Sequence, residues 1–244
     1  MIKTFKIIFY LGEHMFFKDS LEYRALPLPD RFDWGEEERL AKSRNFYNWM
    51  RKRHSVRDFK KTRINKEIIE NAIRAAGRAP SGANHQPWHF VAISMPEIKS
   101  KIRKAAELEE KEFYSGGAGD EWLKALEPMG TDESKPHLED AAWLIVVFAQ
   151  RYGFFKDGSR YKNYYVPESV GIASGFLIAS LHHAGLSILT HTPNPMRFLN
   201  ELLGRPKSEK PIMILAVGEP SSQATVPVVA KLKKTDNEIM TIHE

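Results

Sequence analysis

The sequence of 244 residues contains no cysteine. Disulfides, iron–sulfur clusters, thiolate metal sites and cysteine nucleophiles are therefore excluded. Redox chemistry, if the protein performs any, needs a cofactor. The compartment is not indicated by this absence, because the chain has no thiol that could be oxidised.

Long apolar runs are also lacking. Residues 169–196 come nearest to a membrane span, since they include no Asp, Glu, Lys or Arg. A span needs about 20 mainly apolar residues, whereas serines, threonines and histidines are scattered through this stretch. Gly185 divides it into a helical half and a β-branched half. We therefore expect a buried core helix followed by a strand, and no membrane partner.

No block of five or six basic residues is present. The 36 Lys and Arg and 31 Asp and Glu give a net charge of +5, spread along the chain. This balance favours an anionic small ligand over nucleic acid. The N-terminus begins like a targeting segment, but Glu13 and His14 interrupt its apolar run. We interpret residues 1–17 as a soluble arm that need not be ordered, with Met1 or Met15 as the start, in a cytoplasmic protein.

The composition is that of a globular protein, with 42% hydrophobic and 11% aromatic residues. Hydrophobic periodicity, the cap Asn65 and the stop Gly77 predict one α+β or α/β domain over residues 1–244. Extended ends at both termini suggest arms that embrace a second subunit. The expected helices are 36–53, 65–77, 97–113, 166–184 and 196–204, and the expected strands are 88–94, 141–149, 188–192 and 211–218.

Two motifs carry candidate chemistry. The first, RHSVR, places Arg53, His54, Ser55 and Arg57 at a helix end, where two guanidinium groups and a hydroxyl can grip one phosphate. A solvated cationic helix end explains the same pattern. The second, APSGANHQPW over residues 79–88, has small residues that let its backbone approach a planar ligand, or it is only a loop.

Together the two motifs resemble the FMN-binding nitroreductase superfamily, and the downstream sequence resembles its iodotyrosine deiodinase branch. The resemblance covers roughly residues 46–240, through the segments IRKAAELEEKEFY, KNYYVPESVGIASG, ELLGRP, AVGEPSSQATVP and NEIM. It implies an α+β fold with a mixed sheet flanked by helices, in a homodimer with exchanged arms. FMN would lie at the subunit interface.

The resemblance also implies which residues bind the cofactor. Arg53, His54, Ser55 and Arg57 would hold the ribityl phosphate, although the family often has arginine at the position of His54. The family's late phosphate-binding arginine is absent. We expect Lys233 in its place, with Lys231 and Lys234 as alternatives. The flavin itself would contact Pro80, Ser81, Gly82, Thr190, His191 and Thr192.

Glu110, Tyr114 and Lys135 match the residues that bind the halotyrosine zwitterion in the deiodinases, at the same separations of 4 and 21 residues. Glu110 and Tyr114 share a helical face, and a carboxylate, a phenol and a lysine suit a ligand ammonium and carboxylate. Without the resemblance, a solvated charged helix is the better explanation of Glu110. The implied partner is a halotyrosine or a similar halophenol.

The implied reaction is reductive removal of halide by reduced FMN, with reduced nicotinamide or a reductase as the electron source. Ala83 would offer its backbone amide to the substrate phenolate, which favours the charge shift in the ring. Thr192, or otherwise Thr190, would donate to flavin N5. A threonine-rich strand end bonded to its own backbone is the plainer interpretation.

Residues 107–140 are expected to form a lid over the substrate. The glycines at 116, 117 and 119 raise the entropy cost of ordering it, so it closes on substrate in this interpretation. A general NAD(P)H-dependent nitro or quinone reductase is the first alternative, and a non-catalytic flavin- or ligand-binding protein the second. His85 and His89 have metal spacing, but Pro87 opposes the helix that zinc would need. We expect His182, His183 and His191 to be satisfied core or interface histidines.

Overall fold

The computed structural model describes residues 23–117, 119–155 and 157–244, so the arm 1–17 and both candidate starts lie outside the described residues. A four-stranded sheet of order β1-β2-β6-β5 forms its centre. The named strands of this sheet pair antiparallel, and an isolated parallel bridge from Ser55 to Ile188 makes it mixed. Its strands are β1 (Trp88–Ile93), β2 (Trp143–Gln150), β5 (Ser187–His191) and β6 (Glu209–Gly218).

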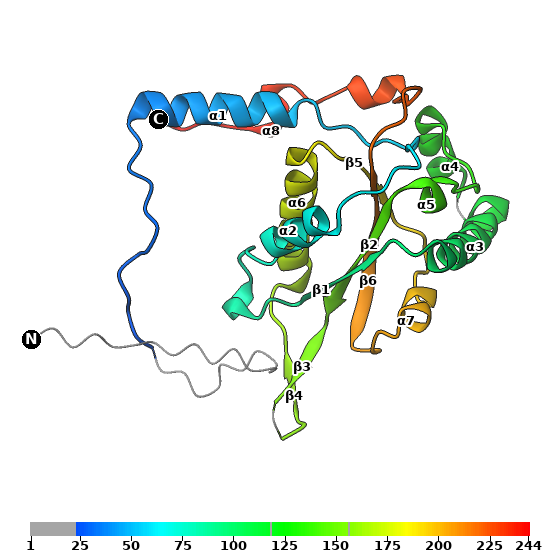
Figure 1. The fold of residues 1–244 in the computed structure, drawn as a ribbon, viewed down its shortest axis with the longest axis horizontal. Coiled ribbons are helices and arrows are strands. Elements are labelled where there is room, and N and C mark those ends of the chain that lie inside the picture. The colour runs from blue at the N-terminus through cyan, green and yellow to red at the C-terminus, as the bar shows by residue number, and fades with distance from the viewer. Residues whose placement is uncertain (1–22, 118, 156) are drawn as a thin grey trace, which may run out of the picture.

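Helices cover both faces of this sheet (Figure 1). Side chains of β2 alternate between the two faces, as a pleated strand requires. Ile145 and Val147 pack with α2 (Lys66–Ala76) and α6 (Val166–His183). Leu144 and Val146 pack on the opposite face, in the core shared by α3 (Pro96–Glu112), α5 (His137–Asp140) and α7 (Phe198–Leu202). The expected layered α+β arrangement is confirmed.

Local signals fixed some element ends well. The Asn65 side chain accepts a hydrogen bond from the Glu67 amide at 2.9 Å, and Gly77 caps the other end of α2. The expected end of the first helix at residue 53 is wrong. The helix α1 (Glu36–Met50) ends earlier because the following segment turns toward β5, where the Val56 amide donates to the Ile188 carbonyl at 3.4 Å.

Several short elements were not expected from the sequence. A hairpin of β3 (Tyr152–Phe154) and β4 (Arg160–Lys162) extends below the sheet in Figure 1. Its Arg160 guanidinium lies 4.6 Å from the Tyr152 ring centroid. The remaining elements are η1 (Gly82–Asn84), η2 (Phe113–Gly117), α4 (Asp120–Leu126), η3 (Glu127–Met129), η4 (Val228–Lys231) and α8 (Asp236–Ile239).

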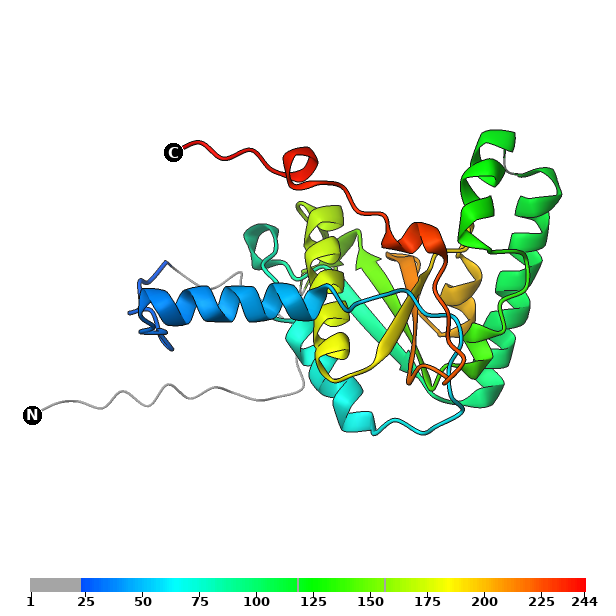
Figure 2. The same cartoon turned by 90° about the horizontal axis from the view of Figure 1, so that it is seen from above.

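Two helices leave apolar side chains uncovered. The helix α1 has no buried residue, and it extends away from the sheet together with the C-terminal segment (Figure 2). Residues 166–184 form the expected core helix, but it is not buried on every side, because Ile172 and Phe176 of α6 are 41% and 44% exposed. Within the described ranges, no helix is both long and apolar enough to cross a membrane.

Candidate active site

A cavity of about 220 Å³ lies between the end of α3, α4, the loop before α5 and the end of β5. It brings together residues that are far apart in the chain. Three of them are the predicted ligands of an amino-acid zwitterion, and three follow one another at the end of β5. The lining includes Arg57, Glu110, Phe113, Tyr114, Trp122, Thr131, Lys135, His137, Thr190, His191 and Thr192.

Glu110 and Lys135 meet inside this cavity. Oε2 of Glu110 lies 3.2 Å from Nζ of Lys135, and the two side chains are 13% and 4% exposed. The Lys135 ammonium also contacts the Thr131 hydroxyl at 3.3 Å and the Asp132 carbonyl. Since both charges are largely removed from water, each depends on the other for compensation.

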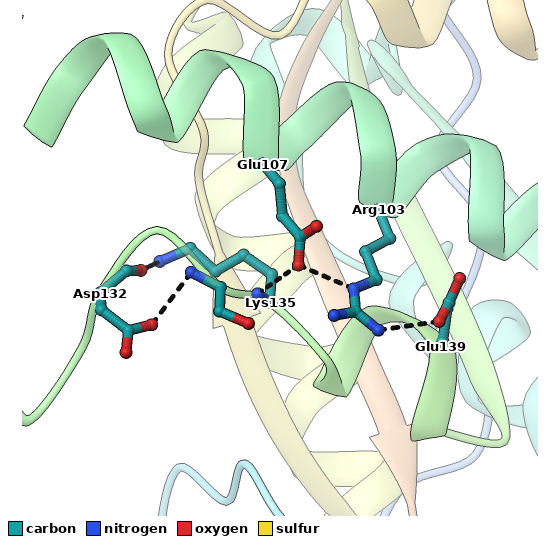
Figure 3. A network of polar contacts seen from close by, with 6 residues as sticks. Arg103, Glu107, Asp132, Lys135 and Glu139 are labelled. Atoms are coloured by element: carbon teal, nitrogen blue, oxygen red, sulfur yellow. Dashed lines mark hydrogen bonds and ion pairs between the residues drawn. The ribbon is translucent and has the colours of Figure 1, made fainter. Parts of the chain in front are cut away.

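The position of Lys135 is fixed by a network outside the cavity (Figure 3). The Lys135 amide donates to Oε1 of Glu107 on α3 at 2.7 Å. The same oxygen accepts from Nε of Arg103 at 2.7 Å, and Nη1 of Arg103 donates to Glu139 at 2.8 Å. These bonds tie the loop to α3, so the Lys135 side chain is directed toward Glu110.

Tyr114 lies one turn beyond Glu110, as their spacing predicts. Its hydroxyl donates to the Thr131 carbonyl at 3.1 Å, and its ring centroid lies 5.5 Å from Nζ of Lys135. Burial raises the pKa of Tyr114, and the nearby Glu110 carboxylate also raises it. The phenol therefore stays protonated near neutral pH and remains a donor.

The end of α3 passes into a π-helical turn, Phe113–Gly117, in which Gly116 has a φ of 133°. A positive φ of this size suits glycine, because a Cβ would be strained there. The Phe113 ring meets the Trp122 ring of α4 edge to face, with centroids 5.1 Å apart. The glycine-rich part of the expected lid is thus a tight turn that places two aromatic rings at the cavity.

The end of β5 presents alternate side chains to opposite sides. Thr190 and Thr192 are exposed, whereas His191 between them is 8% exposed and lies toward Glu110. Both threonines line the cavity and are also exposed, so they border open space at its edge. This arrangement is what a flat ligand lying across the strand end would require.

His191 faces a second buried imidazole. The His137 and His191 rings meet edge to face with centroids 5.4 Å apart, and Nε2 of each is buried with no hydrogen-bond partner among the described residues. His191 is therefore not a satisfied core histidine within one copy of the chain, and the other expectation, that it is an interface histidine, stays a prediction. Burial lowers the pKa of both imidazoles, and the nearby Lys135 and Arg57 charges add to this effect, so that the pKa of His137 is about 4 and that of His191 is about 3.

The other predicted interface histidines behave differently. Nε2 of His182 lies 3.2 Å from the Trp49 carbonyl, and its ring packs on the Trp49 ring at 4.3 Å. The His183 ring meets the same indole edge on at 5.0 Å. These contacts hold the end of α1 against the end of α6.

The RHSVR segment lies beside this end of α6 and the start of β5. The pKa of His54 is lowered by burial and then by the charges of Lys231, Arg53 and Lys233. Arg53 and two lysines near the C-terminus, Lys231 and Lys233, therefore lie close to His54. Lys233 itself donates to the Ala230 carbonyl at 3.0 Å.

The loop of Pro80, Ser81, Gly82 and Ala83 does not line the cavity. It lies at the opposite end of α6, where the Gly82 amide donates to the Ser169 hydroxyl at 3.4 Å. Ser169 and His182 are separated by about 20 Å along α6 at the rise of an α-helix. Within one copy of the chain, this loop and the RHSVR segment therefore lie at opposite ends of α6.

Sequence reasoning missed several cavity residues. Thr131, which contacts both Tyr114 and Lys135, lies one helical spacing before Lys135 but in a loop, so no periodicity marks it. His137 is a single histidine after a proline, and only the packing of α5 against β5 brings it to the cavity. The sequence marks Thr131 and His137 only as polar residues near Lys135 in the chain.

Comparison with known proteins gives consistent results along the chain. The model of the Nitroreductase family matches residues 50–219. An iodotyrosine deiodinase from Haliscomenobacter hydrossis is 52% identical over 198 residues, which are 81% of this chain and 89% of that protein. Iodotyrosine deiodinase 1 from Homo sapiens is 43% identical over 208 residues, covering 85% of this chain and 72% of that protein.

Solved structures show the same likeness. A crystal structure of oxidized iodotyrosine deiodinase bound to FMN and 3-iodo-L-tyrosine matches with a TM-score of 0.66 and 31% identity, covering 82% of this chain and 98% of that chain. A BluB-like flavoprotein from Clostridium difficile 630 matches with a TM-score of 0.61 at 23% identity, over 81% of this chain and 98% of that chain. The second likeness extends to the fold alone.

Proposed function

This chain belongs to the iodotyrosine deiodinase branch of the nitroreductase family, and we propose that it removes halide reductively from halotyrosines with FMN as its cofactor. It is a flavin-dependent oxidoreductase in this proposal. One observation carries it: Glu110, Tyr114 and Lys135 meet in one cavity beside the exposed Thr190 and Thr192. The cavity thus offers a carboxylate, a phenol and an ammonium next to a strand end open to a flat ring.

The residues around RHSVR fit the phosphate of FMN. Arg53, Lys231 and Lys233 place positive charge near His54, and after burial these three charges are the largest causes of its lowered pKa. A phosphate dianion would compensate these charges, with guanidinium and hydroxyl donors from Arg53 and Ser55. We propose that Lys231 and Lys233 both bind the FMN phosphate, whereas the sequence alone favoured Lys233.

A second copy of the chain completes the site in our proposal. The exposed Ile172 and Phe176 form an apolar patch on α6, and α1 carries exposed Phe46 and Tyr47. Two α6 helices packed antiparallel about a twofold axis would bury this patch. The same packing would bring the loop of Pro80, Ser81, Gly82 and Ala83 from one copy next to the RHSVR segment of the other. FMN would then lie between subunits, and the extended ends would be the exchanged arms.

The side chains of the cavity account for substrate binding. The ligand ammonium would replace Lys135 as the partner of Glu110, which frees the Lys135 ammonium for the ligand carboxylate. The Tyr114 phenol adds a hydrogen bond. The Ala83 amide would bind the phenolate oxygen, and the Thr192 hydroxyl would donate at flavin N5 with Thr190 and His191 beside it. Phe113 and Trp122 would shield the aromatic ring of the substrate from water.

Reduced FMN, when bound, supplies the electrons for carbon–halogen cleavage. The protein supplies hydrogen-bond donors that stabilise negative charge on the substrate oxygen and hold the ring against the flavin. We propose that the whole chain, 1–244, is one domain with residues 107–140 as the lid. The electron source would be reduced nicotinamide or a reductase, in the cytoplasm.

An anaerobic titration of the purified protein with 3-iodo-L-tyrosine tests the function. An aromatic ring stacked on FMN quenches flavin fluorescence, so saturable quenching is expected with 3-iodo-L-tyrosine. Plain tyrosine is expected to quench far less, because its phenol ionises less readily than an iodophenol. Mixing the reduced protein with one equivalent of 3-iodo-L-tyrosine should then reoxidise the flavin and release iodide.

Two other outcomes of this titration would each favour a different function. FMN bound without quenching would replace the proposal with a general nitro or quinone reductase. Quenching without flavin reoxidation or iodide release would favour a flavin-containing binding protein that has no turnover.

A further inference from the structure

His191 presents a buried nitrogen to the carboxylate that the proposed function assigns to the ligand ammonium. Its Nε2 lies 3.8 Å from Oε1 of Glu110, and the other carboxylate oxygen is the one that meets Lys135. A separation of 3.8 Å is too long for a hydrogen bond between the two groups. Nε2 has no hydrogen-bond partner among the described residues, although it is buried. A buried polar atom in this condition indicates a group that is supplied from outside the chain.

The environment decides the charge of this imidazole. Lys135, Arg57 and His137 all lie close enough to oppose its protonation, and burial is the largest cause of its lowered pKa of about 3. Glu110 is the carboxylate on the other side, 3.8 Å away. His191 is therefore neutral over the physiological range. A neutral imidazole has one nitrogen with a free lone pair, which can accept a hydrogen bond.

An ammonium group fits between these two acceptors. A nitrogen about 2.9 Å from both Nε2 of His191 and Oε1 of Glu110 is compatible with their separation, because an ammonium has three donors in different directions. We propose that His191 is a substrate-binding residue whose Nε2 shares the ligand ammonium with Glu110. This inference rests on the proposed function, and it adds a neutral acceptor to the charged pair that binds the zwitterion.

The neighbouring groups support this assignment over a metal site. No group of three or more metal-binding side chains occurs within the described ranges. The Lys135 ammonium, 3.2 Å from Glu110, would also repel a metal ion at this place. The His137 ring, at the start of α5, meets the His191 ring edge to face with centroids 5.4 Å apart, so it helps to orient that ring.

The test compares ligands that differ in the ammonium alone. The ligands are 3-iodo-L-tyrosine and 3-(4-hydroxy-3-iodophenyl)propionate, which keeps the phenol, the iodine and the carboxylate. Affinities are measured by flavin fluorescence quenching on the FMN-loaded protein. The variants are His191→Phe, which keeps a ring but has no acceptor, and His191→Gln, whose amide oxygen can accept. His89→Phe is the control histidine replacement, because His89 lies on β1 and does not line the cavity.

His191→Phe is expected to bind 3-iodo-L-tyrosine about tenfold more weakly, and the propionate within about twofold of the parent protein. His191→Gln should recover most of the loss, and His89→Phe should keep the preference of the parent for the amino acid. Circular dichroism and flavin content establish that each variant is folded and loaded. If His191→Phe does not fold, His191→Leu takes its place.

Equal weakening of both ligands by His191→Phe would overturn the inference, since it would indicate a packing role. Unchanged affinity for 3-iodo-L-tyrosine would overturn it as well. Failure of the proposed function looks different, because the parent protein itself would then show no quenching by 3-iodo-L-tyrosine, or would show quenching without flavin reoxidation and iodide release.

Discussion

Glu110 and Lys135 compensate each other inside the cavity, with Oε2 of Glu110 3.2 Å from Nζ of Lys135 and both side chains largely buried. They come from α3 and from the loop before α5. Pairing them in the ligand-free protein avoids two isolated buried charges. The same pair can open for a zwitterion, because the ligand brings one charge of each sign.

Removing one member of this pair should lower the free energy of unfolding more than removing both members. We expect Lys135→Met to lower the free energy of unfolding by about 3 kcal/mol, since Glu110 would be left buried without a partner. The double variant Lys135→Met with Glu110→Gln should recover most of that loss but still not bind 3-iodo-L-tyrosine. Urea unfolding at a fixed saturating FMN concentration measures the difference.

The exposed pair of Lys66 and Glu70, at 2.8 Å, serves as the control. Lys66→Met should change the free energy of unfolding by no more than about 0.5 kcal/mol. A double variant at Glu110 and Lys135 as unstable as the single variant would contradict the assigned coupling.

The buried imidazoles should make stability depend on pH. Burial lowers the pKa of His137 to about 4, below the value of about 6.5 in an unfolded chain. The unfolded chain therefore binds more protons between these values, and stability present above pH 6.5 is lost as pH falls toward 4. We expect His137→Phe to remove up to about 3 kcal/mol of this loss.

Urea unfolding of the parent and of His137→Phe at pH 7.5, 6.0 and 5.0 measures this effect. The replacement His243→Ala, at the exposed C-terminal end, is the control and should leave the slope with pH unchanged. Parallel pH profiles for the parent and His137→Phe would show that His137 is not held neutral by the fold.

The charges around His54 predict selective loss of the cofactor. Arg53→Gln should weaken FMN binding by about tenfold or more, because a charge-assisted hydrogen bond to phosphate is lost. Binding of riboflavin, which has no phosphate, should change far less. Arg51→Gln is the matched control, since Arg51 is exposed at the end of α1. Equal weakening of FMN and riboflavin would place Arg53 at the ring instead of the phosphate.

Site residues that are close together in the sequence could be predicted, whereas contacts between residues far apart in the sequence could not. Glu110 and Tyr114 could be placed together from their spacing alone, because Glu110 lies on α3 and Tyr114 in the π-helical turn that continues it. Lys135 could be joined to them only through the family resemblance. The pairing of His137 with His191 had no signal in the sequence, because it depends on how α5 packs against the end of β5.

The fold shows the same division. The caps of α2 and the buried strand β2 follow from local patterns, and both were predicted. The exposed face of α6 could not be anticipated, since residues 166–184 have no charged side chain except Glu168, and an apolar helix gives no periodicity to mark its outer side. The hairpin of β3 and β4 is too short for a pattern of its own.

The close approach at Gly82 predicts another specific effect. A Cβ at this position would lie 2.8 Å from the Tyr164 carbonyl oxygen and 2.9 Å from Cδ2 of Tyr165. Gly82→Ala should therefore displace the loop and lower the FMN content of the purified protein. Gly35→Ser is the control, since nothing lies within 4 Å of its added Cβ and serine suits the N-cap position that precedes α1. Full FMN content in Gly82→Ala would mean that the loop does not support the cofactor.

The apolar face of α6 predicts the assembly and its link to the cofactor. Phe176 is 44% exposed, and Phe176→Lys would place a charge in the proposed interface of two α6 helices. We expect sedimentation velocity to shift from dimer to monomer, and FMN to be lost in the same variant because each site would need both copies. Leu108→Lys, at a 64% exposed position on α3, should leave the dimer and its FMN unchanged. A monomeric Phe176→Lys protein that retains FMN would contradict a cofactor shared between subunits, and a dimeric one would place the interface elsewhere.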